Sequence, residues 1–82
     1  MLIEYINEAM GNAHYELIED DKIFWGEIPG LKGVWARGKT LEECRNVLRE
    51  ALEEWIVFRL KRNLEIPVIK GINLNVIQRV IG

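Results

Sequence analysis

TLEECRNVLREALEEWIVFRLKR, residues 40–62, carries the strongest structural signal in the chain. It begins with a capping box, because the Thr40 hydroxyl can accept a hydrogen bond from the Glu43 amide while the Glu43 carboxylate reaches back to the Thr40 amide. Acidic side chains in the first turn and basic ones in the last suit the helix dipole. Apolar residues recur at steps of three and four, the spacing of one helix face: Leu41, Cys44, Leu48, Ala51, Trp55 and Phe58, widened by Val47, Leu52 and Ile56. The stretch therefore predicts a helix over residues 41–62.

Three short strands are predicted before this helix. Residues 14–19 alternate along a strand, and residues 23–28 are rich in β-branched and aromatic side chains. The polar pair Asp20-Asp21 between them favours a turn, so the two strands form a hairpin. Pro29-Gly30 and Gly33 bound a loop, and residues 33–37 give the third strand.

The two ends of the chain add smaller elements. Residues 2–10 place apolar side chains on one helix face and stop at Gly11-Asn12, which predicts a short N-terminal helix. Ile66-Pro67 ends the long helical region, because proline favours an extended backbone in the residue before it. Residues 68–74 are predicted as a last strand, while the tail over residues 75–82 fits a strand and a helix equally. The fold class is α+β: a two-layer domain of β-β-β-α-β order, with one sheet face packed on the long helix.

Composition limits the function classes. The 82 residues form one domain, 1–82, whose core covers residues 14–74. The net charge of −2 argues against nucleic-acid binding by bulk electrostatics, since neutralising phosphates takes clustered Lys and Arg. A single cysteine allows no intramolecular disulfide, and the sequence has neither a membrane-length apolar run nor a signal peptide. We therefore expect a cytoplasmic protein.

Carboxylates on the predicted hairpin form the candidate partner-binding surface: Glu16, Glu19, Asp20, Asp21 and Glu27. Convergent carboxylates could also hold the metal ions of a nuclease, which is the first alternative. Turns are commonly acidic for local reasons, so we favour partner binding over catalysis. We expect no catalytic residue, no metal site and no cofactor in this chain.

Five side chains outside that set invite a functional reading. His14, the single histidine, is expected at the surface, and Cys44 in the core, where a free cysteine behaves as a small apolar residue. Trp55 lies on the helix stripe and is also expected in the core. Trp25 and Trp35 lie on strands whose buried face periodicity does not identify, so either could anchor a partner.

The C-terminal part is unusually aliphatic. Leaving so much apolar surface in water costs about 25 cal/mol per Å². Packing across a homodimer or homotetramer would remove that cost, and we favour this over folding back onto the chain's own sheet. The candidate oligomer interface consists of Val68, Ile69, Ile72, Leu74, Val76 and Ile77.

Several segments together resemble the HicB-like antitoxin family: GEIPGLKGV over residues 26–34, GKTLEEC over 38–44, LREALEEW over 48–55, and Ile66-Pro67. The resemblance implies a degenerate ribonuclease-H-like fold. It also implies a small basic partner, a HicA-type toxin that cuts mRNA and whose active site the antitoxin covers. Fuller members carry a C-terminal DNA-binding domain, for which residues 68–82 are too few. We therefore expect a short form without direct nucleic-acid binding, and DNA-binding autoregulation is the second alternative.

Overall fold

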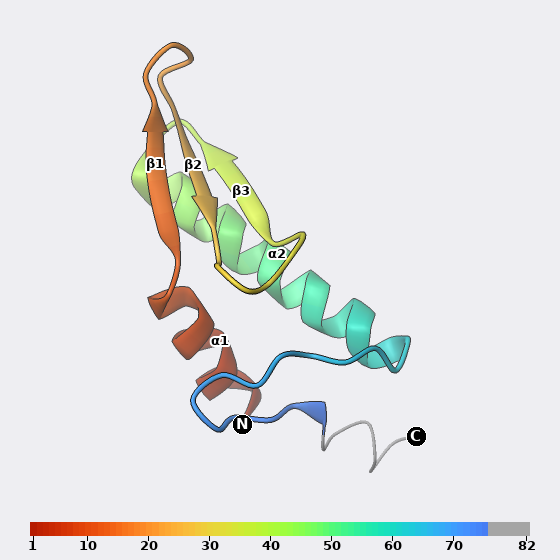
Figure 1. The fold of residues 1–82 in the computed structure, drawn as a ribbon. Helices are drawn as coiled ribbons and strands as arrows, with labels where there is room; N and C mark the ends of the chain where they lie inside the picture. The colour runs from red at the N-terminus through yellow and green to blue at the C-terminus, as the bar shows by residue number, and fades with distance from the viewer. Residues whose placement is uncertain (76–82) are drawn as a thin grey trace.

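Residues 1–75 are described by the structure, a computed structural model, as two helices and a three-stranded antiparallel sheet. The elements run α1 (Leu2–Gly11), β1 (His14–Ile18), β2 (Ile23–Glu27), β3 (Trp35–Gly38) and α2 (Leu41–Lys61), as Figure 1 shows. The sheet order is β1-β2-β3, and α2 packs across one face of it. The α+β class is confirmed, as is the N-terminal helix predicted over residues 2–10. No helix within residues 1–75 is long and apolar enough to cross a bilayer.

α2 begins at the predicted cap. The Thr40 hydroxyl oxygen accepts a hydrogen bond from the Glu43 amide at 3.0 Å. The Glu43 carboxylate accepts from the amide of Lys39 at 3.3 Å, one residue earlier than the capping box predicts. Both contacts satisfy or shield amides at the start of the helix, where no intrahelical acceptor exists.

The buried row of α2 is narrower than the predicted stripe. It consists of residues at steps of four: Cys44, Leu48, Leu52 and Ile56. Leu41, Val47 and Phe58 were expected in the stripe and are exposed instead. The row is narrow because a three-stranded sheet covers only a strip of the helix surface. Residues at steps of four drift slowly around the helix axis, so the row can face the sheet at one end of α2 and the loops beyond the sheet at the other.

Two glycines let α2 approach the sheet closely. A Cβ on Gly38 would lie 2.5 Å from the Cys44 nitrogen and 2.8 Å from its Cα. A Cβ on Gly26 would lie 3.1 Å from the Cys44 sulfur. Cys44 is fully buried at this crossing, as expected, and burial raises the pKa of its thiol above the ordinary value. It therefore packs as a core residue.

The prediction of a strand over residues 68–74 is wrong. Ile69 and Ile72 exchange two backbone hydrogen bonds across a tight turn and form an isolated bridge. Lys70 and Gly71, between them, both have positive φ, 46° and 78°. That left-handed pair reverses the chain, so the aliphatic residues around it read as one strand in sequence but belong to a loop. The choice between strand and helix for the tail, residues 75–82, is not decided, because residues 76–82 lie outside the described residues.

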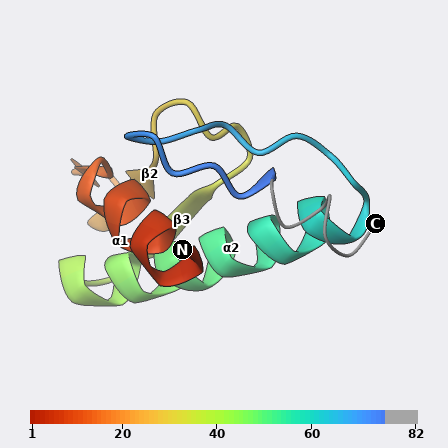
Figure 2. The ribbon, with the colours of Figure 1, turned by 90° about the horizontal axis from the view of Figure 1, so that it is seen from below.

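This C-terminal loop packs against α1 rather than joining the sheet. The Tyr5 hydroxyl donates a hydrogen bond to the carbonyl oxygen of Pro67 at 2.6 Å. The Lys70 ammonium lies 3.2 Å from the Glu8 carboxylate. Seen from below in Figure 2, α1, the sheet and this loop all lie on one side of α2. The N-terminal helix is thus part of the domain core, with Tyr5, Ile6, Ala9 and Met10 buried.

Asn75 closes the loop with its side chain. Its Oδ1 accepts from the Ile66 amide and its Nδ2 donates to the Ile66 carbonyl, both at 2.9 Å. The side-chain amide of Asn75 thereby makes the two backbone hydrogen bonds that a neighbouring strand would otherwise make with Ile66. Ile66 and Leu74 are completely buried beside this contact.

Asn75→Ala is expected to lower the unfolding free energy by about 2 kcal/mol, because it leaves both backbone groups of a buried residue without their partner. For a domain of this size the melting temperature would fall by about 8–16 °C. Thermal unfolding followed by circular dichroism measures the shift. Asn46→Ala, at an exposed position of α2, is the matched control and should change little. Equal melting temperatures for the two variants would contradict the role assigned to Asn75.

Candidate partner-binding face

One face of the sheet is uncovered in residues 1–75. Strand alternation and the register place one set of side chains against α2 and the other set on the opposite side. We call that opposite side the open face, and in Figure 1 it is turned towards the viewer. Its residues are His14, Glu16, Ile18, Ile23, Trp25, Glu27, Trp35 and Arg37.

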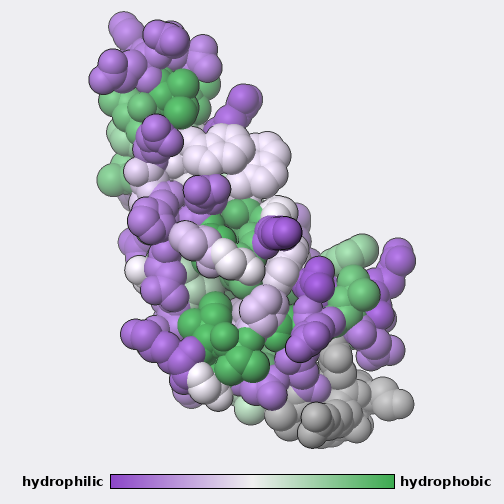
Figure 3. Space-filling model, viewed as in Figure 1, coloured by the Kyte–Doolittle hydropathy of each residue, from purple (hydrophilic) through white to green (hydrophobic). Residues whose placement is uncertain are grey.

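A tryptophan pair lies at the centre of the open face. The rings of Trp25 and Trp35 stack with centroids 4.9 Å apart and planes 6° from parallel. Trp35 is 50% exposed although it is among the largest apolar side chains in the chain. Figure 3, which views the same side, shows pale side chains across the sheet between hydrophilic ones. Large, rigid, partly exposed aromatic groups of this kind are typical anchors of protein interfaces.

Two of the predicted carboxylates flank this pair. Glu16 is opposite Trp25 in the β1–β2 ladder, and Glu27 is opposite Trp35 in the β2–β3 ladder. A shallow hollow of about 280 Å³ is lined by His14, Tyr15, Glu16, Trp25 and Glu27. A tryptophan ring beside two carboxylates suits a Lys or Arg side chain, because the ring attracts a cation and the carboxylates pair with it.

The other three predicted carboxylates lie elsewhere. Glu19, Asp20 and Asp21 form the tip of the β1–β2 hairpin, which projects beyond the rest of the sheet in Figure 1. Within residues 1–75, no group of three or more His, Cys, Asp or Glu side chains is placed to hold a metal ion. The metal-dependent nuclease alternative thus has no assembled carboxylate centre in the described part of the chain.

The predicted oligomer residues are divided between core and surface. Leu74 is completely buried in the chain's own core, and Ile69 and Ile72 are half-buried against it. Val68 is 54% exposed. Val76 and Ile77 lie outside the described residues. Oligomerisation itself stays a prediction, but among the described members only Val68 offers a largely exposed side chain to a second copy.

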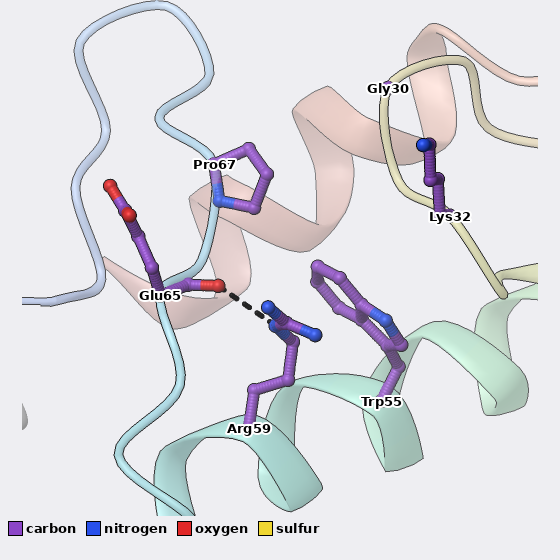
Figure 4. Close-up of a pocket in the computed structure, with 6 residues that line it drawn as sticks. All are labelled: Gly30, Lys32, Trp55, Arg59, Glu65 and Pro67. Atoms are coloured by element: carbon purple, nitrogen blue, oxygen red, sulfur yellow. Dashed lines mark hydrogen bonds between the residues drawn. The ribbon is translucent and has the colours of Figure 1, made fainter.

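A second hollow, of about 500 Å³, lies where the loop after β2 meets the segment after α2. Figure 4 shows Arg59 between the ring of Trp55 and the backbone of Glu65. Its guanidinium lies 5.0 Å from the ring centroid, and its Nε donates to the Glu65 carbonyl at 2.8 Å. Trp55 is therefore half-buried, not fully in the core as expected, and it holds the cation that ties α2 to residue 65. The two segments meeting here, residues 26–34 and 66–67, are two of the motifs that carry the family resemblance.

Strand parity alone did not identify the tryptophan pair. Alternation tells which residues of one strand share a side, but the relative register of β2 and β3 depends on the loop over residues 28–34. In the observed register Trp25 is opposite Arg37, which makes Trp35 its diagonal neighbour on the same side. The sequence shows only that Trp25 and Glu27 share one face of their strand. It shows likewise that Trp35 and Arg37 share one face of theirs.

A solved structure and a family profile match this chain. The Thermus thermophilus protein TTHA0281, whose crystal structure is solved, has 46% sequence identity and a TM-score of 0.83. The match covers 89% of this chain and 90% of that protein. No curated protein sequence matches at a significant level. The profile of the family described as UPF0150-like matches residues 4–67, most of the described chain. The protein therefore belongs to the UPF0150-like family, which is the family of the HicB-like antitoxins.

Proposed function

We propose that this protein is an antitoxin that neutralises a small, basic, mRNA-cutting toxin of the HicA type by holding it against the open face. Family membership supports the class of function. The single observation that carries the choice of surface is the stacked pair Trp25–Trp35, with Trp35 exposed and Trp25 half-buried, on a sheet face that no element of residues 1–75 covers.

The energetics of the open face favour a permanent or frequent partner. An exposed tryptophan pair keeps apolar area in water at about 25 cal/mol per Å². The stack is also rigid, because each ring limits the rotation of the other, so little side-chain entropy is lost when a partner covers it. Interface hot spots combine these two properties.

Charge on and near this face suits a toxin that binds RNA. Glu16 and Glu27 flank the tryptophan pair, and three further carboxylates lie at the hairpin tip. A ribonuclease presents Lys and Arg to the phosphates of its substrate. The same cations can bind the antitoxin carboxylates, which would exclude RNA from the active site. Opposite potentials would also speed the encounter.

The proposal includes the finer features that the family resemblance implies. The antiparallel β1-β2-β3 sheet followed by α2 agrees with a reduced ribonuclease-H-like arrangement whose fourth strand is not found in residues 1–75. A toxin that cuts mRNA acts where mRNA is translated, so the pair would work in the cytoplasm. The protein would act by binding the toxin.

Co-expression with the product of the neighbouring open reading frame tests the proposal. We expect the neighbour alone to stop growth and to degrade mRNA, and the pair to grow normally and to co-purify at equal stoichiometry. A neighbour that is not toxic, or a toxic one that neither binds this chain nor is silenced by it, would refute the antitoxin function.

Trp35→Ala is expected to weaken the complex about thirtyfold, since truncating a central aromatic anchor costs about 2 kcal/mol. Leu17→Ala is the matched control. Leu17 is 48% exposed, close to the 50% of Trp35, but lies on the helix side of the sheet. Affinities from isothermal titration calorimetry decide between them. A complex weakened equally by both variants, or only by Leu17→Ala, would place the toxin on another surface.

A further inference from the structure

The outward side of α2 is the second uncovered surface of the described chain. In Figure 2 every other element of residues 1–75 lies on one side of this helix. The buried row faces those elements, so the opposite side of the helix faces solvent. A solvent-facing helix side is normally polar. Here it carries two large apolar groups: Val57 is 48% exposed and Phe58 is 50% exposed.

These apolar groups lie between charges of opposite sign. Glu54, Val57, Phe58 and Lys61 follow one another at i, i+3, i+4 and i+7, which places them along one stripe of the helix. Together with Glu53 they line a shallow hollow of about 470 Å³. Within residues 1–75, Glu54 and Lys61 make no ion pair. The stripe therefore has an acidic end, an apolar centre and a basic end, and the Arg62 guanidinium lies 5.0 Å from the centroid of the Phe58 ring at the basic side of that centre.

We propose that this stripe is a homodimer interface in which α2 of a second copy packs antiparallel across Val57 and Phe58. A two-fold axis between these residues puts the acidic end of each helix beside the basic end of the other, with Glu54 near the partner copy's position 61. Isologous dimers require such a self-complementary surface. A parallel arrangement would instead bring like charges together, which is unfavourable.

The location of the stripe leaves the open face free. The sheet and α2 are the two layers of the domain, and the stripe lies on the outer side of α2 while the open face lies on the outer side of the sheet. A dimer formed through α2 therefore presents two open faces pointing away from each other. This inference does not depend on the proposed function, because the interface concerns two copies of this chain alone.

Sedimentation equilibrium of the full chain tests the interface. We expect a particle of twice the 9.6 kDa chain mass that dissociates on dilution. Val57→Asp should raise the dissociation constant about a hundredfold, because a carboxylate is then buried against the apolar ring of Phe58 of the second copy. Val68→Asp, at an equally exposed valine outside the stripe, should leave it unchanged. A monomer at all concentrations, or a dimer disrupted by Val68→Asp and not by Val57→Asp, would overturn the proposal.

A charge exchange separates this geometry from other dimers. Glu54→Lys and Lys61→Glu should each weaken the dimer about tenfold, and the double variant Glu54→Lys with Lys61→Glu should restore it. Positions 54 and 61 are seven residues apart, roughly 10.5 Å along the helix, so the restored pairs must form between two copies. Circular dichroism checks that each variant keeps its helix content. Additive weakening in the double variant would overturn the antiparallel arrangement.

Discussion

Gly38→Ala is expected to destabilise the domain by about 3 kcal/mol or more, at the upper end of the cost of overpacking a core. The added methyl group would lie 2.5 Å from the backbone nitrogen of Cys44 and 2.8 Å from its Cα. Backbone atoms of a helix cannot move aside as a flexible side chain can. The variant must therefore push α2 away from β3 and loosen the buried row along the whole crossing.

Gly11→Ala is the matched control for this variant. Gly11 ends α1, and a Cβ there would meet no atom within 4 Å. Alanine at that position should be neutral or stabilising by up to about 1 kcal/mol, because it restricts the unfolded chain and favours the helix. The total stability of a domain of this length is about 4–12 kcal/mol, so Gly38→Ala removes a large part of it. Chemical denaturation measures both variants. A Gly38→Ala protein as stable as the wild type would show that α2 does not approach β3 this closely.

Leu48→Ala is expected to cost about 3–5 kcal/mol, the range for deleting a fully buried leucine and leaving a cavity. Leu48 has no exposed surface and lies in the middle of the buried row of α2, between Cys44 and Leu52. The neighbouring elements cannot collapse into the space, because the sheet and α1 are both packed against the buried side of α2 and are held there by their other contacts.

Val47→Ala is the control for the cavity. Val47 precedes Leu48 on the same helix but is 39% exposed, so its truncation should cost less than about 1 kcal/mol. Urea denaturation measures both variants, with the slope of the transition unchanged and only its midpoint shifted. If Val47→Ala were the more damaging of the two, the assignment of the buried side of α2 would be wrong.

Local signals in the sequence account for most of the secondary structure. The cap at Thr40 and the hairpin turn at Asp20-Asp21 are short-range features, and the structure confirms the elements they predict. The loop over residues 68–74 was predicted as a strand because its composition is aliphatic, and that composition gives no sign of the turn at Lys70-Gly71. Tertiary contacts also fix the loop, among them the side chain of Asn75 on the backbone of Ile66 and the ion pair of Lys70 with Glu8, and these are not visible in the sequence.

The candidate site was predictable in part. Glu16 and Glu27 could be placed on the hairpin, and the structure puts them together on the open face. Their three companions lie at the hairpin tip, beyond the paired part of β1 and β2, which a set chosen by charge alone does not reveal. The stacking of Trp25 on Trp35 depends on a register between two strands joined by a loop, and no local pattern encodes that register.

The hydrogen bond from Tyr5 to Pro67 joins residues 62 positions apart in the chain. Closing so long a loop costs entropy before any contact repays it, so we expect the contact between α1 and the segment after α2 to form late as the chain folds. The hairpin, β3 and α2 are linked by much shorter connections. During synthesis the open face can therefore form from residues 14–61 before the chain has been completed, and the ends of the domain add stability to a face that already exists.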